Sequence, residues 1–192
     1  IGNFIGTDLK GTRVLGNRSN TGIGVFIGSG ASYNTIGGLT LAERNIIAGD
    51  GYAMVQILGT TTTKNTVVGN YIGTDVTGQA SFGNAHHSMS IEMGGYNNRI
   101  KRNVINGNGD FAVLIQDWGS WGNEVVGNLV GTDASGTVAV SNYRGAGVSI
   151  GAPFNKVGGT TPEERNIISV NGGSGVVVKR YGVGDLLIVG NF

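Results

Sequence analysis

The sequence contains no cysteine, only two prolines and few charged residues, which make up 13% of its 192 residues. Without cysteine the chain has neither disulfides nor thiolate metal sites, and its cellular compartment stays open. A net charge of +1 gives no basis for nucleic-acid binding or for attraction to an anionic membrane surface. No apolar run is long enough to cross a bilayer, so membrane insertion is not predicted.

Glycine is abundant instead, with 37 residues. Glycine destabilises helices because it loses the most backbone freedom on ordering, and it is common at turns. This composition predicts an all-β chain divided by frequent turns.

One short pattern recurs along the whole chain: an asparagine followed by two apolar residues. It occurs at Asn3, Asn45, Asn70, Asn103, Asn128 and Asn166, and its beginning returns at Asn191. A pattern that returns this regularly indicates a repeat array.

Each repeat contains two further strand-like segments. The first has apolar residues with a period of two, and its inward positions end in Ile27, Ile57, Ile91, Ile115, Ile150 and Val178. The second opens with asparagine at Asn34, Asn65, Asn98, Asn123 and Asn155. Three strands per turn of chain predict a parallel β-solenoid of about six rungs stacked ~4.8 Å apart, with asparagine ladders running along it.

Two kinds of insertion alternate along the array. One follows Asp8, Asp75 and Asp133; the other occupies 37–44 and 158–165 and is absent from the middle of the chain. We call the second kind the knuckles. Thr40 with Glu43, and Thr161 with Glu164, have capping-box spacing, which predicts a single helical turn in each knuckle.

We expect residues 1–192 to form one domain of three approximate units, 2–68, 69–126 and 127–189. The two ends fall in the same position of the repeat and carry no polar cap, which predicts a fragment of a longer array. Its expected partners are neighbouring repeats of the parent chain, or further copies associated end to end.

The motif Gly-Asn-x-Ile-Gly-Thr-Asp occurs at 2–8 and 69–75 and, with valine for isoleucine, at 127–133. It resembles the right-handed parallel β-helix repeats of large secreted or surface-attached bacterial proteins, and is similar in plan to the pectate-lyase-like superfamily. The resemblance covers essentially the whole chain and implies a right-handed β-helix of secreted or cell-surface location. It does not define one activity, because this fold carries lyases and hydrolases as well as arrays without catalysis. We expect a non-catalytic structural or glycan-binding module, with a polysaccharide lyase or glycoside hydrolase as the alternative.

The three Gly-Thr-Asp corners raise the question of a metal. Asp8, Asp75 and Asp133 are candidates for a calcium ladder, since Ca²⁺ needs several oxygen ligands. The same slot in the other repeats holds Asp50, Asn108 and Asn171, residues that favour turns. We therefore favour turns over calcium sites and predict no cofactor.

One set of residues has the composition of an acid–base site. Tyr52, His86 and Asp110 occupy the same slot of successive repeats, so they are expected to stack one strand apart. They are also ordinary turn residues, and neither a nucleophile nor oxyanion donors accompany them. The outward slots of the long strands hold a single carboxylate, Glu92, which is poor material for paired-carboxylate chemistry.

The missing middle knuckle predicts a notch with cations on its floor, at Arg99, Lys101 and Arg102. Such a groove suits an acidic polysaccharide, although the interpretation we favour for Arg99 is an exposed pair with Glu124 one rung on. Trp118, with Trp121 beside it, is a candidate for stacking on a sugar ring or for capping the edge of the core.

Overall fold

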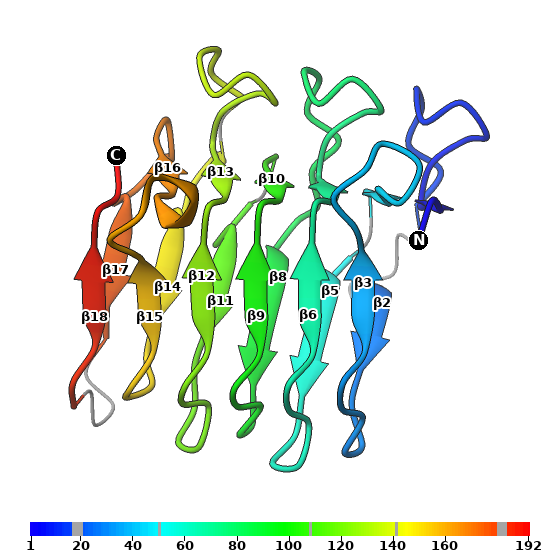
Figure 1. Ribbon diagram of the computed structural model, residues 1–192. Coiled ribbons are helices and arrows are strands. Elements are labelled where there is room, and N and C mark those ends of the chain that lie inside the picture. Colours follow the sequence, from blue (N-terminus) through cyan, green and yellow to red (C-terminus); the bar gives the residue numbers. More distant parts are fainter. Residues whose placement is uncertain (17–20, 50, 108, 141, 180–183) are drawn as a thin grey trace.

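A computed structural model describes residues 1–16, 21–49, 51–107, 109–140, 142–179 and 184–192 (Figure 1). Within them the chain is a right-handed parallel β-helix of three six-stranded sheets. Each of the six rungs contributes one strand to each sheet, as the sequence predicts. No helix in these ranges is long and apolar enough to cross a membrane.

The first sheet contains β1 (Phe4–Ile5), β4 (Ile46–Ile47), β7 (Tyr71–Ile72), β10 (Val104–Ile105), β13 (Leu129–Val130) and β16 (Ile167–Ile168). The second sheet has the longest strands: β2 (Ile23–Ile27), β5 (Ala53–Leu58), β8 (His87–Glu92), β11 (Val113–Ile115), β14 (Val148–Ile150) and β17 (Val176–Val178). The third sheet contains β3 (Thr35–Gly37), β6 (Thr66–Val68), β9 (Arg99–Lys101), β12 (Glu124–Val126), β15 (Lys156–Gly158) and β18 (Leu187–Val189).

The predicted apolar column runs through the interior along the second sheet. Strand pairing places six side chains one above the other, Ile27, Ile57, Ile91, Ile115, Ile150 and Val178. The four central members of this column are fully buried. The predicted register is therefore confirmed, and the core is a set of stacked Val and Ile rows.

The asparagine ladders are also present. In the longer ladder each side chain binds the next rung: Asn70 donates its backbone N–H (2.9 Å) and its amide Nδ2–H (3.1 Å) to Oδ1 of Asn103. Asn103 makes the same two bonds to Asn128, at 3.0 and 3.1 Å. A second ladder links Asn34, Asn65, Asn98, Asn123 and Asn155. These ladders satisfy buried polar groups at two corners of every central rung.

The knuckles differ from the prediction in one respect. Among the described residues, only the second knuckle contains a helical turn, the 3-10 helix η1 (Pro162–Glu164). In the first knuckle the carboxylate of Glu43 accepts hydrogen bonds from the backbone N–H (3.1 Å) and hydroxyl (3.0 Å) of Thr40, without a helix. Proline at the first helical position fixes φ near the helical value, and the first knuckle has Leu41 there.

Candidate functional site

The aspartates of the three insertions organise their own loops. Oδ1 of Asp8 accepts the backbone N–H groups of Thr12 (2.7 Å) and Arg13 (3.1 Å). Asp75 and Asp133 accept equivalent pairs of N–H groups, as expected for turns. The bond from the Thr12 N–H is the main cause that lowers the pKa of Asp8, and the Ser135 hydroxyl does the same for the pKa of Asp133.

Hydrogen bonds from each aspartate to the backbone of its own loop are those expected if the aspartates stabilise turns. No group of three or more His, Asp or Glu residues in the described part of the chain has the arrangement of a metal site. Two members of the slot, Asp50 and Asn108, lie outside the described residues.

Tyr52, His86 and Asp110 stack on successive rungs as predicted. The backbone N–H of Asp110 donates to the carbonyl of His86 (2.8 Å), and that of His87 donates to the carbonyl of Tyr52 (3.1 Å). Nδ1 of His86 lies 2.9 Å from Oδ2 of Asp110, in a pair whose side chains are 42% and 44% exposed. The Tyr52 and His86 ring centroids are 6.1 Å apart.

Glu92 joins this group, which the sequence reasoning missed. The residue is only 5% exposed, yet its carboxylate is fully partnered. It accepts hydrogen bonds from the Tyr52 hydroxyl (3.2 Å) and from the side-chain amides of Gln56 (3.1 Å) and Gln116 (3.0 Å). The available signal was its position as the one acid in an outward slot, between rungs that carry glutamine.

The contact with Glu92 bears on catalysis. Burial, together with the Glu92 carboxylate, raises the pKa of Tyr52 to about 12. The phenol therefore keeps its proton at neutral pH and acts as a hydrogen-bond donor to Glu92. This disfavours Tyr52 as a general base and leaves His86 with Asp110 as the remaining acid–base pair.

His87 lies beside this line, buried among rings. It stacks on Phe111 with centroids 5.6 Å apart and meets Tyr52 edge to face at 5.5 Å. Burial is the main cause that lowers its pKa from 6.5; the charges of Asp110 and Glu92 oppose this shift, and those of His86 and Lys179 add to it. His87 is therefore neutral in the folded protein at neutral pH.

We expect this histidine to make the fold acid-sensitive. Because the pKa of His87 is lower in the folded state, the unfolded chain binds more protons as the pH falls below 6.5. The free energy of unfolding should decrease over that window and level off below the folded pKa. Urea titrations between pH 7.5 and 5 would show this, and His87→Phe should reduce the slope. His86, the exposed neighbour, provides the control. If His86→Gln removes the dependence of the free energy of unfolding on pH and His87→Phe keeps it, the assignment to His87 is contradicted.

The predicted notch exists on the third sheet. A hollow of about 270 Å³ is lined by Leu39 of the first knuckle, by Glu163 and Glu164 of the second, and by Arg99, Lys101, Arg102 and Val126 between them. The missing middle knuckle thus leaves a hollow with cations on its floor.

The cations in the notch are not equivalent. Arg99 Nε lies 2.6 Å from Oε2 of Glu124, which confirms the favoured pairing. Glu164 on the wall pairs with Lys156 at 3.0 Å. Lys101 and Arg102 form no ion pair or side-chain hydrogen bond with any described residue. They are the cations available to a ligand.

Arg102 has an unusual backbone for its residue type. Its φ is +54°, and the equivalent turn positions are glycines, Gly69 (φ +66°), Gly127 (φ +66°) and Gly190 (φ +65°). A Cβ at Gly69 would lie 1.9 Å from the carbonyl oxygen of Gly38, and one at Gly127 would lie 2.4 Å from that of Glu163. The knuckles therefore require glycine beside them. Arg102 has no knuckle against it and keeps a side chain at a backbone cost of about 1 kcal/mol.

The matching arginines of the other units have aromatic partners. The guanidinium of Arg44 lies 3.9 Å from the centre of the Tyr71 ring, and that of Arg165 lies 5.3 Å from the Phe192 ring. The residue in the corresponding place next to Arg102 is Leu129. Arg102 therefore lacks the cation–π contact that holds the other two.

The two tryptophans lie on the turn of the fourth rung. Trp121 stacks on Tyr96 with centroids 4.7 Å apart, whereas Trp118 is 78% exposed. Trp118 therefore does not cap the core.

No protein-family model, curated protein or solved structure matches the chain.

Proposed function

We propose that this chain is a rigid, non-catalytic β-helix module that binds an acidic glycan in the notch between its knuckles. The observation that carries the proposal is the pair of cations Lys101 and Arg102, which pair with no described residue and lie on a floor bounded by two walls. We further propose that it belongs with the secreted or cell-surface bacterial repeat proteins that its Gly-Asn-x-Ile-Gly-Thr-Asp motif resembles.

The floor of the notch is held by backbone hydrogen bonds on both sides. The N–H of Gly69 donates to the carbonyl of Lys101, and the N–H of Arg102 donates to that of Val126, each at 3.2 Å. The cations therefore project from a frame that does not need to rearrange on binding, which limits the entropic cost. A concave site strengthens their attraction for an anion.

The acidic wall favours a particular orientation of the ligand. Glu163 and Glu164 repel carboxylates and accept hydrogen bonds from hydroxyl groups. A uronic-acid unit satisfies both surfaces when its carboxylate lies over Arg102 and its hydroxyl groups face the wall. The hollow of about 270 Å³ has room for a short stretch of such a chain.

Arg102→Gly tests this assignment without disturbing the fold. Glycine occupies the equivalent turns, so the variant should be as stable as the parent or more stable by about 1 kcal/mol. Its affinity for uronic-acid oligosaccharides should fall about tenfold, the effect of losing one charge-assisted contact. Calorimetric titration at two salt concentrations measures both the affinity and its electrostatic part.

Arg13→Ala is the matched control, because it removes the same charge from an exposed loop residue. Equal affinity in the parent and Arg102→Gly, or an equal loss in Arg13→Ala, would remove the notch from the proposal.

The His86–Asp110 pair is the one observation that favours an enzyme. The non-catalytic role would be overturned if the unsubstituted chain released oligosaccharides from a panel of polysaccharides and His86→Ala did not.

A further inference from the structure

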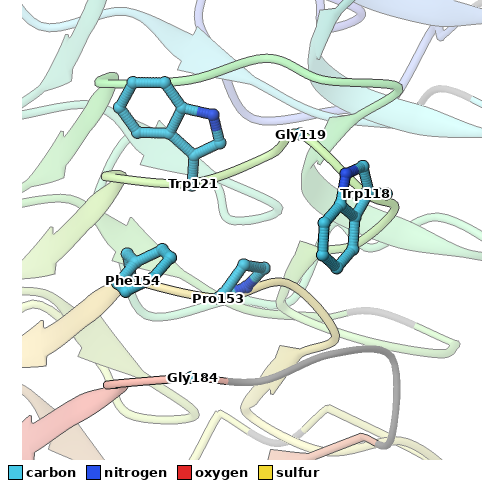
Figure 2. A pocket seen from close by; sticks show the side chains of 6 residues that line it. All are labelled: Trp118, Gly119, Trp121, Pro153, Phe154 and Gly184. Atoms are coloured by element: carbon cyan, nitrogen blue, oxygen red, sulfur yellow. The ribbon is translucent and has the colours of Figure 1, made fainter.

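A second hollow, of about 730 Å³, is shown in Figure 2. The turns that line it precede the third-sheet strands, so it lies at the opposite end of these strands from the notch. It is lined by Trp118, Gly119, Trp121, Pro153, Phe154 and Gly184. In Figure 2 the Trp118 indole lies on one side of Pro153 and the Phe154 ring on the other, and the Trp121 indole points away from Pro153 and Phe154.

The hollow arises from a mismatch between successive turns. The turn after the second sheet covers 117–122 on the fourth rung but only 152–154 on the fifth. The longer turn has three residues more than the turn of the fifth rung and one more than 93–97 of the third rung. Relative to the third rung the extra residue is Trp118, because Gly119 lies against Gly94 and the N–H of Asn97 donates to the carbonyl of Trp121 (3.0 Å). The long turn therefore overhangs the short one and leaves a step lined by rings.

The rings are mounted on a hydrogen-bonded frame. The N–H of Gly122 donates to the carbonyl of Phe154, and the N–H of Phe154 donates to that of Gly184, both at 3.0 Å. Trp121 is further held by its stack on Tyr96. The fixed backbone beneath the rings, and the stack that holds Trp121, lower the entropic cost of binding.

The chemistry of the lining selects a class of ligand. Among the residues that the structure describes, no charged side chain lines the hollow, so these residues give an ionic ligand no partner. The indole N–H groups of Trp118 and Trp121 donate to no group among the described residues. An entirely apolar partner would bury these donors unsatisfied, at a cost that opposes binding. A pyranose ring offers both an apolar C–H face for stacking and hydroxyl groups that accept from the indoles.

We infer that this hollow is a binding site for a neutral sugar chain, formed by Trp118 and Phe154 and bordered by Trp121. It is separate from the notch and does not depend on acidic-glycan binding there. The two sites differ in the ligand they select, one by cations and the other by ring stacking.

The chain has only two tryptophans, and both line this hollow. Intrinsic tryptophan fluorescence therefore reports on this site alone. We expect a saturable blue shift on titration with at least one of a panel of neutral hexasaccharides, built from β-1,4-glucose, α-1,4-glucose, β-1,4-mannose and β-1,4-xylose units. Trp118→Ala should weaken binding at least tenfold, followed through Trp121, and Trp118→Phe should recover part of the affinity. Arg102→Gly and the exposed-aromatic control Tyr143→Ala should bind as the parent does.

The opposite outcomes are equally clear. A panel without any saturable shift overturns the inference. So does binding of a hydrophobic dye that is lost in Trp118→Ala while no sugar binds, because the hollow is then only an apolar surface. Neutral-sugar binding that Arg102→Gly removes would place the ligand in the notch instead.

Discussion

Replacing Ile91 by aspartate is expected to prevent the chain from folding. Ile91 is fully buried in the interior column, between Ile57 and Ile115 on the neighbouring rungs. A carboxylate there has no partner, and burying it costs several kcal/mol in addition to the lost apolar contacts. That is comparable with the whole stability of an ordinary domain, about 5–15 kcal/mol. Loss of the β-sheet circular dichroism spectrum is the measurement.

The position in the array enlarges the effect. Ile91 lies on the third of six rungs, and a solenoid rung is stabilised mainly by its neighbours. Disruption there leaves short flanking stacks that bury little core on their own. Ile91→Val should cost only about 1 kcal/mol. Met93→Asp places the same charge two residues away on an exposed turn and should be tolerated, so a folded Ile91→Asp variant would contradict the assigned interior.

The architecture could be predicted from the sequence because each rung repeats the same pattern of apolar residues and ladder asparagines. A period of two sets the side of the sheet on which Ile57 and Ile91 lie, and the spacing from each ladder asparagine sets their register. The same alignment placed Arg99 beside Glu124, and the two residues pair as expected. The notch also follows from alignment, since it is the absence of a segment that two other units contain.

Contacts across rungs between residues in different slots of the repeat could not be predicted in this way. Tyr52 reaches Glu92 on the next rung, a contact set by side-chain direction and by the glutamines that flank the carboxylate. The repeat fixes where each Cα lies but not which way a long side chain turns. The hollow beside Trp118 has a similar origin, in the unequal lengths of two turns.

The sequence contained a signal for Arg102 that we missed: it stands where other repeats have glycine. Where no knuckle leads into the ladder asparagine, the residue before it is glycine at Gly69, Gly127 and Gly190, and Arg102 is the exception among these described turns. A left-handed conformation outside glycine is an observation from which a functional hypothesis can start. It directs attention to Arg102 rather than to Arg99, whose charge is already paired.

Asn103→Asp is expected to be the most damaging change of nearly constant shape. Asn103 is 1% exposed, and its Nδ2 donates to the carbonyl of Val67 (3.0 Å) and to Oδ1 of Asn128 (3.1 Å). Its Oδ1 accepts from the backbone and side-chain N–H groups of Asn70. Aspartate keeps the acceptor but places a second oxygen against two acceptors. At pH 7 the expected loss is roughly 3–6 kcal/mol, from two unsatisfied buried groups and their repulsion.

The pH dependence distinguishes this mechanism from a packing defect. A protonated carboxyl can donate one of the two lost hydrogen bonds, so the pKa of the introduced carboxyl should be raised in the folded state. Below the unfolded pKa of about 3.9 the carboxyl is protonated in both states, and the contribution of its proton to stability is fully present. As the pH rises from that value through the folded pKa, the variant should lose stability relative to the parent. Urea titrations at pH 4 and pH 7 measure the difference. Asn34→Asp, at the exposed end of the other ladder, should lose much less. An Asn103→Asp variant equally destabilised at both pH values would contradict the assignment of its amide as an essential donor.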